Sequence, residues 1–439
     1  MDPKIRVDLQ NLKEVIWPII GIELLRLYGI SDKITFLMIC GWIAVIIIHL
    51  RKIIIPKILG LYIYLLMIVI ASIIGLLFYK VRDIERDLYY ILPTIAVMLI
   101  GYIIEKTRRD KSLRKTIYLM GTMISVYALY TLIRNITAIS ELSQIRAAVS
   151  GGISEVVIIA SALFIEKIIY KRVIFSKSKD LFMLFVMFAQ VAVSFGRTAI
   201  GTTILICASG FFAAFLTRED RGRLIQKMSL LLIISVFLLY IIMKIVPTSV
   251  SEEFYAKLDN SFNEMSTNED IDSTSEAMDN WRGYEIQSAQ RQWLESNVLE
   301  MLFGQGMGTG IKIKYIPFVW ERTEVVEDNA IPILHNCYYT ILVKAGLLGT
   351  LSLIMIYFSG VILLIKFRKH MSDVQCELVV LTAVGIGMAF MGYFTRGIVS
   401  QTYCFAWGLI VGSINCQVNS FPFMDMKEIT GEEYGVQQN

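Results

Sequence analysis

His335 is the first residue of this chain that could do chemistry, because it stands where a polar segment meets an apolar one. It is followed directly by Asn336 and then by an apolar run over 338–364. Imidazole exchanges protons near neutral pH, so this side chain could serve as a general base for an acceptor hydroxyl. The alternative is a structural role, since a lone histidine at a helix start is often a cap. The other two histidines, His49 and His370, lie near basic residues and suggest no chemistry.

Arg197 is the second candidate, since it interrupts an apolar stretch of about 35 residues. It lies in the segment Ser194–Thr198, which reads SFGRT and predicts the tip of a tight helical hairpin. A guanidinium at the membrane edge is costly, so such an arginine is a functional hypothesis by default. The competing reading is a snorkelling side chain that only marks the interface.

Four further arginines on the predicted outer side, Arg146, Arg282, Arg291 and Arg396, could join Arg197 around an anion. Arg146 precedes a turn at Ser150–Gly152, and the helix N-terminus that follows would itself favour negative charge. Arg282 and Arg291 lie in a long polar segment, where a solvated helix face is the competing explanation. The guanidinium fork pairs with phosphate oxygens, so several arginines around one cavity would suit a pyrophosphate.

These residues need elements to position them, and the composition indicates which elements those are. Hydrophobic residues make up 55% of the 439 residues and charged residues 18%, below the roughly 25% typical of soluble domains. Apolar runs extend for about 17–27 residues, the length that crosses a bilayer as a helix. They lack the alternation of an outer-membrane barrel strand. The sequence therefore predicts an all-α, polytopic integral membrane protein.

About twelve transmembrane helices are expected. Their ranges are 15–30, 34–50, 58–79, 88–104, 116–133, 152–170, 181–196, 198–216, 229–247, 338–364, 377–395 and 398–415. The first is the weakest, because Glu23 and Arg26 interrupt it. Met1–Glu14 is polar, so we expect no cleavable signal peptide, and the first span can act as the insertion signal.

The basic loops predict the topology. Five basic segments fall on one side if both termini are cytoplasmic, as the positive-inside rule requires. These segments are 51–57, 106–115, 167–179, 218–227 and 366–369. The segment Lys80–Asp87 is an exception, since it mixes three basic with three acidic residues. We therefore expect both termini in the cytoplasm and the long loop on the outer face of the membrane.

Four regions follow from this topology. They are an N-terminal transmembrane bundle of about nine spans (1–247), a large extracytoplasmic loop (248–336), about three C-terminal spans (337–415) and a cytoplasmic tail (416–439). Within the loop, Trp281–Leu302 has apolar residues at helical spacing and predicts one amphipathic helix. Gly304–Gly310 predicts a sharp, flexible turn. It is not a P-loop, because it follows no strand and lacks the Lys-Ser/Thr pair.

Taken together, these segments resemble the O-antigen ligase/polymerase superfamily, which includes the Wzy-type oligosaccharide repeat-unit polymerases. The likeness is strongest in residues 335–349, HNCYYTILVKAGLLG, which are similar to the family's signature at the span after the large loop. Upstream, Arg282, Trp293 and residues 302–308 (LFGQGMG) are similar to the family's R…W…GxGxG stretch. The SFGRT hairpin and Arg146 with the following glycines resemble its other outer elements, so the likeness covers roughly residues 140–365.

The resemblance implies a membrane-embedded glycosyltransferase of the GT-C type, whose donor and acceptor are undecaprenyl-diphosphate-linked oligosaccharides. It also implies a bacterial cytoplasmic (inner) membrane, with the active site facing the periplasm or the exterior. An acceptor hydroxyl attacks the anomeric carbon with inversion, and lipid diphosphate leaves. No metal, nucleotide, other cofactor or nucleic acid is implied, whereas a chain-length regulator and a flippase are partners that such a polymerase would have. The implied catalytic residues are His335, Arg282, Arg197 and Glu285; the implied diphosphate-binding residues are Arg197, Arg282, Arg146 and Arg291; Asn336 and Tyr338 are implied supports.

Two alternatives remain open at this point. An O-antigen ligase would transfer a finished lipid-linked glycan to lipid A core or another acceptor. Ligases often carry leucine four residues after the hairpin arginine, whereas Gly201 stands there in this chain. A lipid-linked oligosaccharide flippase or another transporter is the third reading. Transporters are expected to carry broken helices or ionisable residues near the bilayer midplane.

Overall fold

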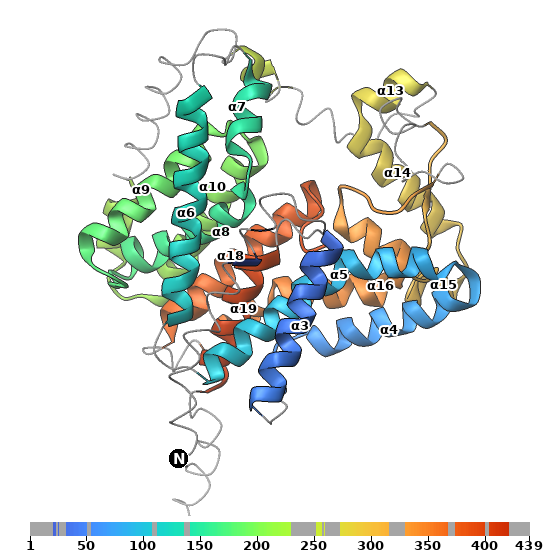
Figure 1. The fold of residues 1–439 in the computed structure, drawn as a ribbon, viewed down its shortest axis with the longest axis horizontal. Coiled ribbons are helices and arrows are strands. Elements are labelled where there is room, and N and C mark those ends of the chain that lie inside the picture. Colours follow the sequence, from blue (N-terminus) through green and yellow to red (C-terminus); the bar gives the residue numbers. More distant parts are fainter. Residues whose placement is uncertain are drawn as a thin grey trace, which may run out of the picture.

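The computed structural model of the chain describes residues 21–22, 25, 32–50, 54–107, 112–135, 141–229, 252–256, 259, 273–315, 330–367, 374–399 and 404–420. This part is almost entirely helical (Figure 1). In its first half, the helices are α3 (Asp32–Leu50), α4 (Leu61–Phe78), α5 (Val81–Thr107), α6 (Ser112–Asn135), α7 (Leu142–Val149), α8 (Ile153–Phe164), the π-helical η2 (Ile165–Ile169), α9 (Lys177–Val193) and α10 (Arg197–Thr217).

In the second half, short elements precede further long helices. The short elements are α13 (Thr274–Asp279), α14 (Trp281–Leu294), α15 (Val298–Phe303), β1 (Ile311–Lys312) and β2 (Ala330–Ile331). The helices after them are α16 (Cys337–Tyr357), α17 (Ser359–Lys366), α18 (Gln375–Phe394) and α19 (Cys404–Asn419). The two strands pair antiparallel, with Ile311 opposite Ile331.

The prediction of an all-α membrane protein is confirmed at the level of helix type, length and polarity. Six helices of the described part are long and apolar enough to cross a membrane, or up to seven if α7 and the following helix, bent by 69°, form one span. The predicted spans 15–30 and 229–247 lie largely or wholly outside the described residues. Helices lie over the other ten predicted ranges. The total of twelve crossings and the GT-C architecture stay predictions.

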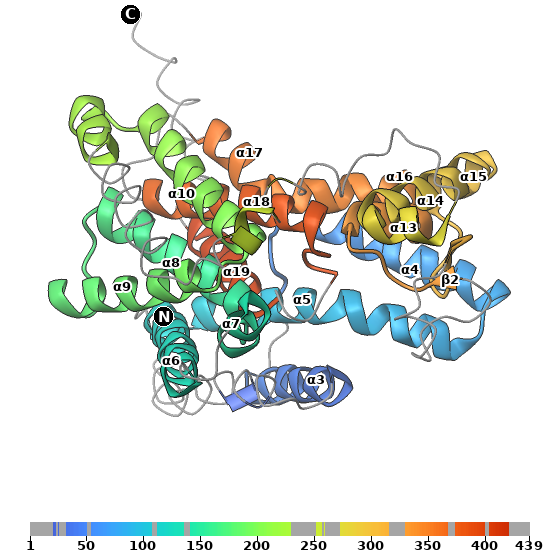
Figure 2. The same ribbon diagram turned by 90° about the horizontal axis from the view of Figure 1, so that it is seen from above.

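The helices do not form one parallel bundle. Both α3 and α6 are seen lengthwise in Figure 1 and nearly end-on in Figure 2, whereas α5 runs across the page in both views. Helix direction alone therefore does not define a common membrane normal.

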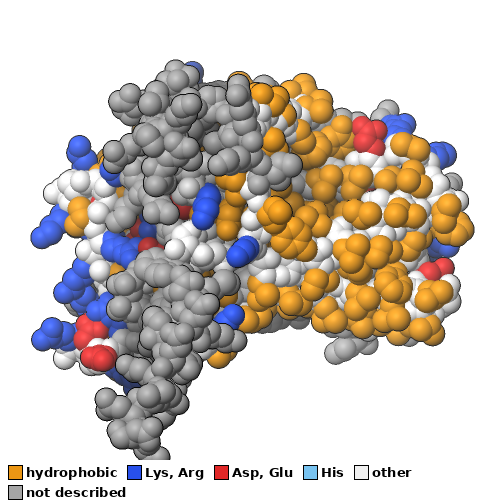
Figure 3. Space-filling model, turned by 90° about the horizontal axis from the view of Figure 1, so that it is seen from below, with side chains coloured by type: hydrophobic (Ala, Val, Ile, Leu, Met, Phe, Trp, Pro, Cys, Tyr) orange, Lys and Arg blue, Asp and Glu red, His pale blue; other side chains and the backbone are white. Residues whose placement is uncertain are grey.

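Apolar side chains cover the outer faces of several helices. On α4, exposed Tyr62, Leu66, Val69, Ile73 and Leu76 follow one another at the spacing of a single helix face. Figure 3 shows the half of the molecule that contains α4, where hydrophobic side chains spread widely with few charges among them. A soluble monomer rarely exposes an apolar patch of this extent, whereas a bilayer would cover it.

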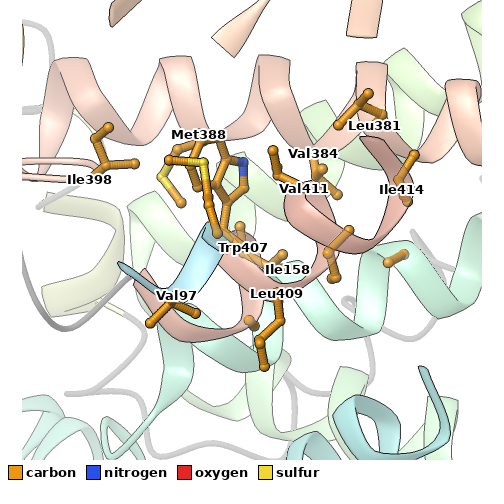
Figure 4. Packing of buried hydrophobic residues seen from close by; sticks show 14 of the residues in the cluster. Val97, Ile158, Leu381, Val384, Met388, Ile398, Trp407, Leu409, Val411 and Ile414 are labelled. Atoms are coloured by element: carbon orange, nitrogen blue, oxygen red, sulfur yellow. The ribbon is translucent and has the colours of Figure 1, made fainter. Parts of the chain in front are cut away.

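The core is centred on α19, which packs closely along α5. Trp407 is fully buried and lies among Met388, Val411 and Ile158 (Figure 4). The first turn of α19 is capped by a buried carboxylate from α8, because Glu155 accepts hydrogen bonds from two backbone N–H groups there, at 3.2 and 2.6 Å. A carboxylate suits this place, since the N-terminus of a helix carries partial positive charge.

Three of the five basic segments that the charge rule places on one side meet in the structure. Glu377, at the start of α18, pairs with Arg172 (Nη2–Oε2 3.0 Å) and lies 3.6 Å from Arg114. Arg218 donates from Nη1 to the carbonyl oxygen of Ile169, at 2.6 Å. These contacts therefore bring four helix ends together: the ends of α8 and α10 and the starts of α6 and α18. Buried charges that are paired in this way avoid the large penalty of an isolated one.

Two predictions of local structure need correction. Helix α5 begins at Val81, so Lys80–Asp87 is largely helical rather than a loop, and Asp87 is only 1% exposed. The predicted helix Trp281–Leu302 is two helices, α14 and α15. Asn297 separates them, because its side chain accepts a hydrogen bond from the backbone N–H of Glu300 (3.0 Å) in a capping box that starts the second helix.

Candidate active site

A small apolar cluster sets α14 against the start of α16. Its buried members come from α13, α14, the two short strands, the segment after β2 and α16 itself; they are Ala277, Tyr284, Ala289, Ile311, Ile313, Ile331, Leu334 and Val343. The strand pair brings the chain after Ile331 alongside α14. The polar segment that ends in His335 therefore reaches α16 against a packed surface.

His335 and Glu285 form the centre of the candidate active site. The backbone N–H of His335 donates to Oε2 of Glu285 at 2.8 Å. The ring Nδ1 lies 3.0 Å from Oε1 and 3.1 Å from Oε2 of the same carboxylate. Glu285 is 1% exposed and the His335 side chain 31% exposed. One buried carboxylate thus fixes both the backbone and the ring of a histidine that a substrate can reach.

This pairing determines which ring nitrogen is available for chemistry. An ionised carboxylate only accepts hydrogen bonds, so Nδ1 carries the proton in the neutral ring. The lone pair then stands on Nε2, as in other pairs where a carboxylate orients a catalytic histidine. Glu285 therefore acts as a positioning residue, and Nε2 of His335 is the atom that could accept a proton.

Two buried N–H donors flank His335 without partners among the described residues. Asn336 caps α16, since its Oδ1 accepts from the N–H of Tyr338 (3.0 Å) and Tyr339 (3.3 Å), and its Nδ2 is left unpaired. The backbone N–H of Arg396 donates to the carbonyl of His335, and the buried Nε of Arg396 is unpaired as well. Buried donors are usually satisfied, so each of these two is available to a further partner.

Arg396 is a site residue that the sequence placed among the outer arginines without a specific role. It follows the apolar run that forms α18 and has a positive φ of 71°. The available signal was a lone basic residue directly after a predicted span, on the side otherwise poor in basic residues. What could not be read from the sequence is that the end of α18 turns back onto His335.

Tyr338 has a structural role next to the site. Its hydroxyl donates to the carbonyl oxygen of Ala389 at 2.7 Å, and its ring meets that of Tyr357 edge to face, with centroids 6.1 Å apart. The start of α16 is therefore tied to α18. The hydroxyl of Tyr338 is therefore engaged in holding the two helices together.

Arg146 and Arg197 meet at a second place, the hairpin between α9 and α10. Arg146 donates from Nη2 to the carbonyl oxygen of Phe195 at 2.9 Å, and Phe195 has a positive φ of 47°. Arg197 begins α10 and lies near enough for its positive charge to repel that of Arg146. The predicted hairpin tip is thus confirmed, with two guanidinium groups around it.

The hairpin pair and the histidine lie on either side of α18. Gly201, one turn into α10, faces the Phe390 ring of α18, and that helix also contacts α16 through Tyr338.

Arg282 and Arg291 occupy different faces of α14. Arg282 is half-buried and stands three residues before Glu285, so the two share a helix face. Arg291 is exposed and lines a separate cavity of about 600 Å³. Arg282 thus shares a helix face with Glu285, whereas Arg291 lines a cavity whose lining includes neither Glu285 nor His335.

No protein-family model matches this chain, and no curated protein matches it significantly. The resemblance to the O-antigen ligase/polymerase superfamily therefore rests on the motifs alone. Within the described ranges, no three His, Cys, Asp or Glu side chains gather as a metal site would require.

Proposed function

We propose that this chain is a membrane glycosyltransferase that polymerises undecaprenyl-diphosphate-linked oligosaccharide repeat units into a surface polysaccharide. The observation that carries the proposal is the His335–Glu285 pair at the start of α16. A reachable imidazole, oriented by a buried carboxylate and flanked by unpaired donors, has the composition of a site that deprotonates a hydroxyl.

The proposed reaction uses one residue as base and the arginines as electrostatic partners. Nε2 of His335 accepts the proton of an acceptor sugar hydroxyl as its oxygen bonds to the anomeric carbon of the donor. The bond between that carbon and the phosphate oxygen breaks, and lipid diphosphate leaves with the electron pair. Arg282 and Arg197 would stabilise its charge, a contribution of roughly 3–4 kcal/mol for one well-placed donor. The chemistry requires no metal or nucleotide.

The placement of charge supports a site on the face opposite the basic segments. Val149 and Gly151, before α8, accept hydrogen bonds from Gln190 near the end of α9, at 3.0 and 3.3 Å. The far ends of these two helices carry the paired Lys167 and Asp180. The hairpin arginines thus lie at the other end of α8 and α9 from the basic residues that the charge rule makes cytoplasmic.

A lipid-linked oligosaccharide transporter is the second candidate, because two features favour it. Helix α16 is broken at Gly346 (φ 71°, ψ −172°), and Lys344 and Asp87 form a fully buried ion pair beside the break. Both features are expected of transporters. They weigh less here because the break is hydrogen-bonded by residues 305 and 306, and the ion pair is closed to solvent.

The decisive experiment supplies purified protein with the native lipid-diphosphate-linked repeat unit, without metal or nucleotide, and resolves the products on a gel. Wild-type protein is expected to give a ladder of chain lengths. His335→Ala should lower the rate at least about a hundredfold, the usual contribution of a general base. Arg197→Ala should act in the same direction, whereas the exposed Arg223→Ala serves as a matched control and should leave the ladder intact.

Each other outcome has a definite meaning. A full ladder from His335→Ala would refute the proposed base. No ladder from folded wild-type protein and a confirmed repeat unit would refute the polymerase. Transfer to an added lipid A core acceptor would then indicate a ligase, and movement of intact repeat units across a proteoliposome membrane would indicate a transporter.

A further inference from the structure

Arg396 follows α18 in a turn that three other parts of the chain hold in place. Its backbone N–H donates to the carbonyl oxygen of His335. Two residues on, the N–H of Ile398 donates to the hydroxyl of Tyr357 in α16 at 3.4 Å. The carbonyl oxygen of Ile398 accepts from the hydroxyl of Thr94 in α5 at 2.9 Å. The backbone of Arg396 is therefore fixed beside the histidine.

The backbone conformation of this turn suits glycine better than arginine at position 396. Arg396 has a φ of 71°, and the next residue, Gly397, has a φ of 49°. A residue with a Cβ is destabilised in this left-handed region, whereas glycine adopts it freely. Strained backbone of this kind occurs most often at functional sites. An arginine in such a position, next to a candidate base, suggests that its side chain has a task there.

The guanidinium of Arg396 is unpaired. The residue is half-buried, its Nε is buried without a hydrogen-bond partner, and no carboxylate of the described ranges forms an ion pair with it. By contrast, Arg114, Arg172 and Arg218, at the helix ends near the basic segments, each pair with a carboxylate. A guanidinium has five N–H donors and no acceptor, so that of Arg396 can still bind an anion.

A second unpaired donor belongs to the residue that follows His335. Asn336 is 2% exposed, and its Nδ2 has no partner while its Oδ1 caps α16. The cap places this residue at the N-terminus of a long helix, where negative charge is favoured. Both neighbours of His335, one along the chain and one through its carbonyl oxygen, thus carry unused donors.

The proposed reaction determines which anion comes close to His335. The hydroxyl that gives its proton to Nε2 attacks the anomeric carbon of the donor, and the leaving phosphate is joined to that carbon through one oxygen. The diphosphate of the acceptor is different, because the sugars of its repeat unit separate it from the reacting hydroxyl. The anion nearest the base is therefore the diphosphate of the donor.

We propose that Arg396, with Nδ2 of Asn336 as a second donor, binds the diphosphate of the lipid-linked donor and stabilises its charge as it leaves. The identity of the anion rests on the proposed function, whereas its place rests on the contact between Arg396 and His335. Arg396 joins Arg282 at the histidine site, and it reaches the site from the end of α18 rather than from α14.

The test measures binding apart from polymerisation. Purified full-length protein in detergent is titrated with farnesyl diphosphate and with inorganic pyrophosphate, which share the diphosphate and differ in the lipid. R396Q should bind farnesyl diphosphate at least about tenfold more weakly than wild-type protein, because a charge-assisted contact is lost. R223Q, which removes an exposed arginine near the basic segments, should bind it like wild-type protein.

Two further variants separate binding from folding. R396G removes the guanidinium and relieves the backbone strain, so it should unfold at the same or a higher temperature than wild-type protein and still bind as weakly as R396Q. N336D keeps the oxygen that caps α16 but replaces the Nδ2 donor with a second carboxylate oxygen, and it should also bind more weakly. An R396G variant that unfolds at a lower temperature would show that the guanidinium is structural, which would overturn the inference.

The remaining outcomes distinguish this inference from the proposed function. Binding that is lost in R396Q and kept in His335→Ala supports the diphosphate site, even if wild-type protein makes no polymer. Polymerisation by R396Q at the wild-type rate overturns the site and leaves the polymerase standing. Wild-type protein that binds neither ligand, or an R396Q variant that binds farnesyl diphosphate like wild-type protein, also overturns the site. Binding of inorganic pyrophosphate alone would overturn the assignment to a lipid-linked donor.

Discussion

At the scale of single residues, the buried carboxylate of Glu285 orients the neighbouring His335. It accepts from both the ring and the backbone of His335, so the ring orientation and its tautomer are determined together. A catalytic base must be held in place before it is useful, because a small misplacement costs a large part of the rate. The pair is therefore more informative than either residue alone.

Glu285→Gln tests that positioning role. The glutamine amide can donate to Nδ1, which would place the ring proton on Nε2 and remove the base, as an amide in place of a carboxylate does in hydrolase triads. We expect a loss of at least about tenfold in kcat with little change in KM. Glu285→Asp, which retains the carboxylate, should recover part of the activity. A Gln variant as active as wild-type protein would show that Glu285 is only structural.

Mutation of the two hairpin arginines should affect different properties of the protein: stability for Arg146 and turnover for Arg197. Arg146 donates to the Phe195 carbonyl, so Arg146→Gln should lower the free energy of unfolding by about 1–3 kcal/mol through the loss of this partly buried hydrogen bond from a charged group. Arg197 begins α10 beside that tip, and Arg197→Gln should reduce turnover about a hundredfold or more while affecting stability less. Thermal unfolding in detergent and the gel assay measure the two effects. A reversal of this order would contradict the assignment.

At the scale of elements, the glycine-rich loop has a role that its sequence did not indicate. The break of α16 at Gly346 leaves the carbonyls of Val343 and Lys344 without helical partners. The backbone N–H groups of Gln305 and Gly306 donate to them, at 2.8 and 3.1 Å. The run predicted to be a flexible turn is thus fixed against α16 by hydrogen bonds. Its sequence suggested a turn, but the partner lies about 40 residues away.

Gly346→Ala should be far more damaging than an ordinary glycine substitution. The residue has a φ of 71°, and an added Cβ would lie 2.3 Å from the carbonyl oxygen of Leu302. The backbone strain alone costs about 1–2 kcal/mol, and the overlap with a backbone oxygen adds to it. We expect little folded protein by size-exclusion chromatography. Gly222→Ala, where nothing lies within 4 Å of the added atom, is the control and should fold normally. Equal yields would contradict the close packing.

The ion pair between α5 and α16 offers a second test at this scale. Lys344 bonds Asp87 and the carbonyl of Thr309, while Asp87 also accepts the N–H of Gly308 at 2.7 Å. Lys344→Met removes the closer of the two cations beside the buried Asp87 carboxylate and leaves Arg86 Nε 3.6 Å away, so we expect a cost of up to about 3–5 kcal/mol. Adding Asp87→Asn should recover part of that loss, because the amide oxygen can still accept from Gly308. A double variant less stable than Lys344→Met would contradict this account, as thermal unfolding would show.

At the scale of the whole molecule, the sequence predicts the helices better than the site. The long apolar runs predicted most helices, and the basic segments marked the loops between them. Both signals are local and strong. The pairing of His335 with Glu285 joins residues 50 apart, and Arg396 comes from a third element. Such meetings depend on how α14, α16 and α18 pack, for which a single sequence carries no direct signal. The sequence predicts the start of α5 too late in the chain, because the charges of Lys80–Asp87 suggest a loop. In the structure Asp87 is buried in an ion pair with Lys344.

The sidedness of the molecule provides the last prediction. The charge rule assigns Lys312 of β1 and Lys177 at the start of α9, both exposed, to opposite sides of the membrane. A membrane-impermeant maleimide should therefore label Lys312→Cys in intact spheroplasts and Lys177→Cys only after lysis, because the bilayer excludes the charged reagent. The wild-type chain, which carries six cysteines, sets the background. Labelling of Lys177→Cys before lysis would reverse the topology and place His335 on the cytoplasmic side, where a polymerase of lipid-linked units exported to the surface could not act.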